Sequence, residues 1–206
     1  MRAIAAFDIG TTAVKAVLVE EAGRPLRTLS RDIPTLYSGD FREQDPHVWW
    51  DAFLDLSARM RESCPGVEIT GIVMSGQMQD VIPVDSRLEP VCPAILYSDG
   101  RAVAEAEELV QKAGAGRILK ATGNHMDGTL SLPKIMWLRK HCPDLYARTC
   151  CFLISSKDYV IARLTGLCAG DYTACSTGPE RFTVEELLEI LEGMTFVEDV
   201  DSVLMR

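Results

Sequence analysis

The N-terminal segment, in which strand-like runs flank a Gly-Thr-Thr turn, constrains the fold most strongly. Residues 3–8 are an apolar run that ends in Asp8, and residues 14–20 alternate in a way typical of a β-strand. Gly10 lies between these runs and permits a tight turn. A third run over residues 25–33 follows another glycine-containing turn. The sequence therefore predicts an antiparallel meander at the N-terminus.

Helix and strand signals alternate after this meander. Asp45-Pro46 has the residue types of a helix N-cap and first turn, and apolar residues then recur at helical spacing. Residues 69–74 are a continuous apolar run, which predicts a buried strand. Further predicted elements are strands over residues 81–84 and 94–97, and helices that begin at Asp99, Ser131, Ser155 (with Asp158 as a capping box) and Thr183. This order indicates an α/β domain with a mixed β-sheet flanked by helices, the pattern of ribonuclease-H-like folds.

Composition narrows the classes of partner. The 206 residues fit one large domain or two small ones. A net charge of −9 argues against nucleic acids and anionic membranes as partners, although local donors can still bind an anionic ligand. We find no signal peptide and no apolar run long enough to span a bilayer. The seven cysteines include no C-x-x-C pair, so we expect reduced, mostly buried thiols in a cytoplasmic protein.

The first candidate site is the turn after the first strand. Asp8 ends that strand and is followed by Gly10, Thr11, Thr12 and Lys15. Backbone N–H groups and threonine hydroxyls in such a turn can bind a phosphate, and a carboxylate can bind magnesium directly or through water. The alternative is a plain strand-turn-strand hairpin with an acid at its end. The chain has neither a Walker loop nor a dinucleotide fingerprint.

Two further segments are candidates for ligand contacts. The segment from Ser75 to Asp80 (SGQMQD), which includes Gln77, Met78 and Gln79, directly follows the predicted buried strand, where polar residues often contact ligands. Tyr97 and Asp99 lie at a predicted strand-to-helix junction. The alternatives are a polar loop for the first segment, and a core tyrosine with an N-cap aspartate for the second.

Taken together and in order, these segments resemble the N-terminal domain of the FGGY family of carbohydrate kinases, and most closely its xylulokinase members. The resemblance extends from residue 4 to about residue 178. It implies a ribonuclease-H-like fold related to actin and hexokinase, in which two domains close over a cleft. The matching segments are AFDIGTTAVKAVLVE, EQDPHVWWDA, GIVMSGQMQD, PAILYSDGRA, ATGN, PKIMWLRKHCPDLYAR, SSKDYVIARLTG and DYTACSTG.

On the phosphate side, the resemblance implies ATP and Mg²⁺ as cofactors. Asp8 matches the acid that is associated with magnesium and the transferring phosphate, and it is therefore the candidate catalytic and metal-binding residue. The phosphate-contacting loop of the family is matched by Gly10, Thr11, Thr12 and Lys15.

On the sugar side, the resemblance implies a sugar or polyol substrate. Met78 and Gln79 match the pair that touches the sugar, and Tyr97 matches an aromatic position, usually Trp, with Asp99 in the same motif. Three residues depart from the xylulokinase pattern: Gln79 replaces a His, Asp80 replaces a Gly and Tyr97 replaces the Trp. The departures all fall in the sugar-binding segments, so they bear on which sugar is bound.

The resemblance also predicts the domain organisation. Family members continue into a Gly-rich segment with the general-base Asp and a domain that binds adenine and ribose, and residues 179–206 match neither. We therefore expect residues 1–206 to be the sugar-binding domain, truncated at its C-terminal end, without the C-terminal nucleotide-binding domain. Its expected partner is that domain, or a second copy bound through the cleft face near Met78 and Tyr97.

Two functions remain open from the sequence. In the first, the chain supplies the sugar-binding half of an ATP-dependent kinase for a ketose such as xylulose and is inactive alone. In the second, it is a catalytically inactive sugar-binding or regulatory module derived from such a kinase. An ATPase of the same superfold is disfavoured, because the EQDP and SGQM segments do not belong to those relatives.

Overall fold

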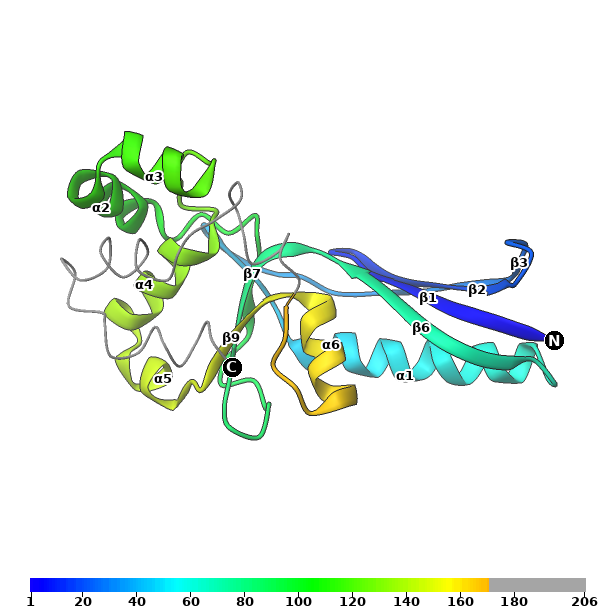
Figure 1. Ribbon diagram of the computed structural model, residues 1–206. Coiled ribbons are helices and arrows are strands. Elements are labelled where there is room, and N and C mark those ends of the chain that lie inside the picture. The colour runs from blue at the N-terminus through cyan, green and yellow to red at the C-terminus, as the bar shows by residue number, and fades with distance from the viewer. Residues whose placement is uncertain (171–206) are drawn as a thin grey trace.

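A computed structural model describes residues 1–170, and its N-terminal half is built on a four-stranded sheet (Figure 1). The strand order is β3-β2-β1-β6, with β1 antiparallel to β2 and parallel to β6. The predicted meander is therefore confirmed, and the apolar run after the first helix becomes the fourth strand. The prediction that this strand is buried is wrong, because it lies at the edge of the sheet and leaves Ile72 and Val73 51% and 55% exposed. The strands are β1 (Arg2–Ile9), β2 (Ala13–Glu20), β3 (Pro25–Asp32) and β6 (Glu68–Gly76).

A second sheet of five strands continues from the first, in the order β4-β5-β8-β7-β9. Only Gln77 separates the end of β6 from the start of β7, so the chain passes from one sheet into the other at this residue. The strands are β4 (Leu36–Ser38), β5 (Phe41–Gln44), β7 (Met78–Val84), β8 (Ala94–Ile95) and β9 (Cys151–Ser155).

The helices divide between the two sheets (Figure 1). Helices α1 and α6 pack against one face of the first sheet, whereas α2 to α5 gather at the far end of the second. No helix within residues 1–170 is both long and apolar enough to cross a membrane. The helices are α1 (Pro46–Ser63), α2 (Val103–Ala113), α3 (Ala115–Thr122), α4 (Ser131–His141), α5 (Pro143–Arg148) and α6 (Ser156–Thr165).

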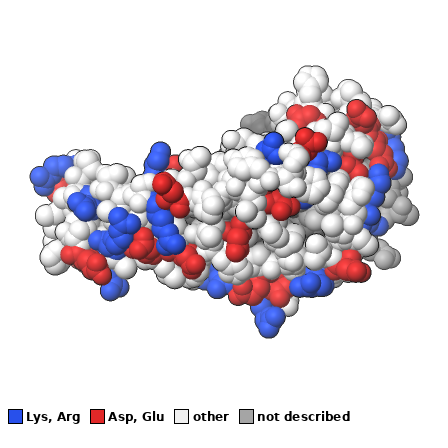
Figure 2. Space-filling model, turned by 180° about the vertical axis from the view of Figure 1, so that it is seen from behind, with Lys and Arg blue, Asp and Glu red and all other residues white. Residues whose placement is uncertain are grey.

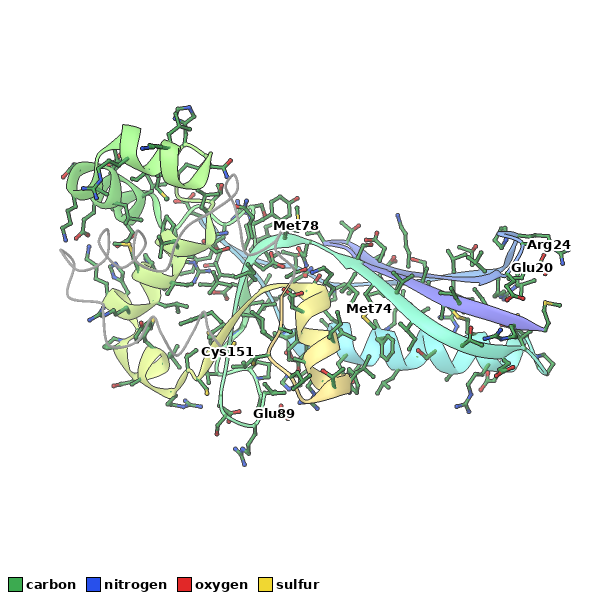
Figure 3. The ribbon with its side chains drawn as sticks, in the orientation of Figure 1. Glu20, Arg24, Met74, Met78, Glu89 and Cys151 are labelled. Carbon is green, nitrogen blue, oxygen red and sulfur yellow. The ribbon has the colours of Figure 1, made fainter. Side chains whose placement is uncertain are left out.

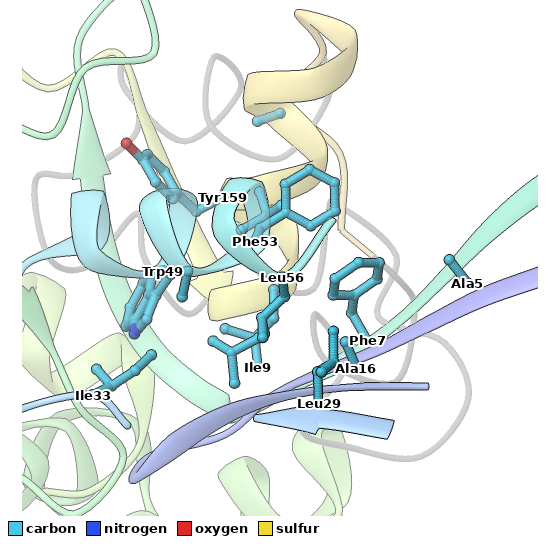
Figure 4. Packing of buried hydrophobic residues seen from close by; sticks show 14 of the residues in the cluster. Ala5, Phe7, Ile9, Ala16, Leu29, Ile33, Trp49, Phe53, Leu56 and Tyr159 are labelled. Carbon is cyan, nitrogen blue, oxygen red and sulfur yellow. The ribbon is translucent and has the colours of Figure 1, made fainter. Parts of the chain in front are cut away.

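The main core lies between the first sheet and helices α1 and α6 (Figure 4). Burial alternates along β1, so Phe7 and Ile9 face the helices while Asp8 lies on the opposite, open face. Trp49 and Leu56 of α1 are fully buried against this layer. Burial of each such side chain contributes about 1.5–3 kcal/mol. This packing fixes which face of the sheet is open to ligands, and Asp8 is on it.

Several predicted boundaries differ from the structure. The second helix begins at Val103 rather than at Asp99, because the Asp99 carboxylate is held by Arg101 and by the backbone of Arg42 instead of capping a helix. Ser155 is the N-cap of α6, as predicted, but its side chain makes no capping hydrogen bond. Short elements that the sequence did not indicate are β4, β5, α3 and α5.

The surface is characterised by the exposure of its cysteines and by the distribution of its charged side chains. The expectation of mostly buried thiols is wrong: Cys150 is exposed and the other cysteines within residues 1–170 are only partly buried. On the face shown in Figure 2, basic and acidic side chains alternate without a large patch of one sign. The DYTACSTG segment, Cys175 and the helix predicted at Thr183 lie outside the described residues.

Candidate active site

Three polar side chains lie side by side on the open face of the first sheet. In the strand register, Asp8 of β1 is paired with Lys15 of β2 on one side and with Ser75 of β6 on the other. The Ser75 hydroxyl donates a hydrogen bond of 2.7 Å to Oδ1 of Asp8. All three residues are exposed. The structure therefore brings Asp8 and Lys15 of the first candidate segment together with Ser75, which begins the second.

The charges of this group are not neutralised by one another. Within residues 1–170, Asp8 and Lys15 form no ion pair, and Oδ2 of Asp8 receives no hydrogen bond. An exposed carboxylate and an ammonium on neighbouring strands are thus both available to a ligand. Because β1 and β6 are parallel, Asp8 and Ser75 also lie at the carboxyl ends of adjacent strands, where α/β proteins commonly bind ligands.

The Gly-Thr-Thr turn lies directly beyond Asp8. The N–H of Gly10 closes the turn by donating to the carbonyl of Ala13 at 3.1 Å, so this donor is already used. The carbonyl of Thr12 accepts from Ile33 at 2.9 Å. The N–H groups of Thr11 and Thr12, in contrast, donate to no other described residue. Two adjacent backbone donors in a turn next to an acid and a lysine form an arrangement that can bind a phosphate.

A buried pair of glutamine amides holds this turn in place. The Nε2 of Gln44 donates to the carbonyl of Thr11 at 2.6 Å and to the hydroxyl of Thr35 at 2.8 Å. Its Oε1 accepts from Trp49 at 2.9 Å and from Gln77 at 3.0 Å. The hydroxyl of Thr11 in turn donates to Gln77 at 3.2 Å. The side chain of Gln77, a predicted sugar contact, is therefore engaged in supporting the phosphate-side turn.

The sugar-side segments begin directly after Gln77, at the junction of the two sheets (Figure 3). Met78 and Tyr97 each leave nearly half of their surface exposed, at 46% and 45%. Gln79 has a φ of +64°, a left-handed conformation that is uncommon for residues other than glycine. Two large side chains thus remain accessible where the resemblance predicts a sugar pocket.

The carboxylate of Asp99, in contrast, is fully buried and fully engaged. Arg101 donates to both of its oxygens, at 2.8 Å and 2.7 Å, and the N–H of Arg42 donates to Oδ2 at 2.6 Å. Arg101 also pairs with Glu43 at 2.7 Å. Burial alone would raise the pKa of Asp99, but these donors outweigh it and lower the pKa below its usual range. The carboxylate of Asp99, a predicted sugar contact, is therefore engaged by Arg101 and by the backbone of Arg42.

This geometry can be compared with known proteins. The family model for the N-terminal domain of the FGGY family of carbohydrate kinases matches residues 3–179 of the chain. The chain belongs to the FGGY family. A xylulose kinase of Staphylococcus xylosus is 33% identical to this FGGY chain over 167 residues, which are 81% of this chain and 34% of that protein. The chain thus spans about a third of the length of this curated relative.

Solved structures of FGGY kinases share the fold. The xylulose kinase of Rhodospirillum rubrum superposes with a TM-score of 0.82 at 28% identity, covering 86% of this chain and 37% of that one. A gluconate kinase of Lactobacillus acidophilus superposes equally well, with a TM-score of 0.83 at 27% identity, covering 93% of this chain and 40% of that one. The predicted fold class, an α/β ribonuclease-H-like domain of the actin and hexokinase superfamily, is confirmed.

Proposed function

We propose that this chain supplies the sugar-binding and phosphate-binding half of an ATP-dependent kinase that phosphorylates a ketose such as xylulose. The observation that carries the proposal is the group formed by Asp8, Lys15 and Ser75 beside the free N–H donors of Thr11 and Thr12. Membership of the FGGY family and the similarity to xylulose kinases support the choice of substrate.

The residues on the phosphate side fit Mg²⁺ and the phosphates of ATP. Magnesium in kinases is usually bound by one or two carboxylates, by phosphates and by retained waters. Asp8 offers such a carboxylate, with one oxygen that has no hydrogen bond within residues 1–170 and the other oriented by Ser75. When bound, the ion would offset charge on the transferring phosphoryl group. Lys15 and the N–H groups of Thr11 and Thr12 would orient the phosphoryl oxygens.

On the sugar side, the ring of Tyr97 and the thioether of Met78 offer apolar surface for a sugar, and Gln79 follows with a polar amide. We further propose that the adenine site and the general base come from a second domain that lies outside this chain. Met78 and Tyr97 would then be contacts for that domain, or for a second copy of the chain when the domain is missing. The chain alone would bind sugar without turning over ATP.

A chimera tests the proposal. The chain would replace the matching N-terminal third of the Staphylococcus xylosus xylulose kinase, and D-xylulose-dependent ATP turnover would be measured for the chimera and for the isolated chain. We expect turnover by the chimera and none by the isolated chain. D-gluconate and glycerol serve as comparison substrates.

The same experiment separates the alternative function. An inactive sugar-binding module would bind D-xylulose, measured by calorimetry on the isolated chain, without giving turnover in a folded chimera. This alternative stands because the chain has no match to the family's Gly-rich segment with the general-base Asp. If the isolated chain binds no sugar and the folded chimera has no activity, both functions are contradicted.

A further inference from the structure

Lys134 of helix α4 is a fully buried lysine that joins two segments of the sugar side. Its Nζ donates to the carbonyl of Gln79 at 3.0 Å and to the carbonyl of Leu96 at 2.8 Å. Gln79 is a candidate sugar contact, and Leu96 directly precedes Tyr97. A single ammonium thus holds the backbone of both segments from behind.

Asp80 makes a second connection between the same segments. Its side chain is fully buried, and Oδ1 accepts a hydrogen bond of 3.0 Å from the N–H of Tyr97. The hydroxyl of Ser131, in the first turn of α4, donates to the carbonyl of Asp80 at 3.2 Å. Helix α4 therefore contacts the Gln79–Asp80 backbone through both Ser131 and Lys134.

The backbone at Gln79 needs this support, because the sheet does not provide it. The ladder between β7 and β9 is irregular between Met78 and Ile82. Gln79 lies in this irregular stretch, with its left-handed φ of +64°. Such a conformation persists in a residue with a side chain only where the surroundings enforce it. The hydrogen bonds from Lys134 to the Gln79 carbonyl and from Ser131 to the Asp80 carbonyl contribute such surroundings.

Stability alone does not account for these two buried ionisable side chains. Burial lowers the pKa of Lys134 to about 8, with the charges of Asp80 and Asp99 opposing the change. Burial likewise raises the pKa of Asp80 to about 8, opposed by the Tyr97 N–H and by the charge of Lys134. Burying an ionisable side chain costs free energy that a well-packed apolar side chain would avoid. The geometry that the pair enforces therefore needs its own explanation.

We propose that Lys134 and Asp80 are positioning residues that hold the Met78–Gln79 and Leu96–Tyr97 segments at a fixed separation and thereby set the affinity for the sugar. The inference rests on the proposed function, because it assumes that these two segments contact the substrate. Neither residue touches the sugar: both act from behind the site, through backbone groups of the residues that do.

Three variants test the inference, with one control. Lys134→Met removes the donor to both carbonyls, and Asp80→Ala removes the acceptor for the Tyr97 N–H. Asp80→Asn keeps an acceptor oxygen of the same shape and is the conservative rescue. Lys112→Met is the matched control, because this lysine is half-exposed on α2 and pairs only with Glu108 within the described residues.

The measurements are the Kd for D-xylulose by calorimetry, the Tm, and hydrogen exchange at the Tyr97 amide, all on the 206-residue chain. Lys134→Met and Asp80→Ala are expected to weaken D-xylulose binding by about tenfold or more, the size of effect typical of a lost bond to a charged group. Asp80→Asn and Lys112→Met should stay within about twofold of the wild type, since neither variant loses a hydrogen bond to the Met78–Gln79 or Leu96–Tyr97 segment. The Tyr97 amide should lose protection in Asp80→Ala and keep it in Asp80→Asn.

The outcomes separate this inference from the proposed function. If the wild-type chain binds no sugar, the proposed function is contradicted, and the inference fails with it. If the wild type binds D-xylulose and folded Asp80→Ala binds it equally tightly, the positioning role is overturned while the proposed function stands. Should Lys134→Met fail to fold, the comparison of Asp80→Ala with Asp80→Asn still decides, because it changes a single acceptor.

Discussion

The phosphate side and the sugar side of this site are supported in different ways. On the phosphate side, neutral amides of Gln44 and Gln77 hold the turn from within, and the charged groups Asp8 and Lys15 remain exposed. On the sugar side, the ionisable groups Asp80 and Lys134 are buried behind the site, and the accessible side chains of Met78 and Tyr97 are uncharged. Phosphate and magnesium bind through charged groups that must be accessible, whereas a neutral sugar needs no charged contact, so the ionisable groups on its side can lie behind the site and hold the backbone. The difference matches the chemistry of the two ligands that we propose.

The largest expected effect is that of removing the exposed charge on the phosphate side. Asp8→Asn in the chimera should lower kcat by about a hundredfold or more. The variant lacks the negative charge that we propose binds the metal, and the metal stabilises the charge that develops on the phosphoryl oxygens in the transition state. The Tm and the Kd for D-xylulose should change little. A destabilised variant with full turnover would instead make Asp8 a structural residue of the turn.

The second-largest expected effect is the loss of stability when a glutamine amide is removed from the buried network of Gln44 and Gln77. Gln44→Leu leaves the partners Trp49, Thr11 and Gln77 without a hydrogen bond in a buried place, so we expect a loss of about 2–4 kcal/mol in the free energy of unfolding. Urea denaturation measures it. Gln111→Leu is the matched control, since Gln111 is exposed on α2 and should change stability by less than about 0.5 kcal/mol. An equal loss in both variants would contradict the supporting role of the network.

A pH titration tests the buried charges of the sugar side. The pKa of Asp80 is raised to about 8 by burial, an effect that Asp158 reinforces and Lys134 opposes. The folded chain therefore holds a proton that the unfolded chain releases, and stability should fall as the pH rises from 5 towards 8, by at most about 1.4 kcal/mol per pH unit. Above pH 8, the lowered pKa of Lys134 has the opposite sign, so stability should recover. Asp80→Asn should remove the fall below pH 8, and identical curves for both proteins would contradict the assignment.

The smallest effect is expected for Ser75. Its hydroxyl orients Asp8 through one exposed hydrogen bond, so Ser75→Ala should change the free energy of unfolding by less than about 1 kcal/mol and lower turnover of the chimera by only several-fold. A loss of turnover as large as that of Asp8→Asn would give Ser75 a direct part in binding the metal or the phosphate.

The difference between local and long-range contacts explains which features could be predicted from the sequence. The turn after Asp8 and the helix start at Asp45-Pro46 depend on neighbouring residues, and both were predicted from local signals. The engagement of Asp99 by Arg42, and of Gln77 by Gln44, joins residues that are far apart in the chain, so no local pattern reveals it.

Lys134 shows most clearly what could not be predicted from the sequence. In the sequence it is one of several basic residues on a helix of mixed character, and such lysines usually lie in solvent. Only the packing of α4 behind β7 and β8 places its ammonium next to two carbonyls. The turn after Asp8 is therefore predictable from local sequence, whereas its support by Gln44 and Gln77, like the support of the sugar side by Lys134, depends on the tertiary fold.

NMR of the chain with methyl-labelled methionine tests the central claim most directly. D-xylulose would be titrated into the protein, and the signals of the eight methionines followed. The account predicts a saturable shift of the exposed Met78 methyl and no shift of Met60, which is fully buried in the core. An unchanged Met78 signal at sugar concentrations that saturate binding by calorimetry, or no binding at all, would contradict the claim that this chain carries the sugar site.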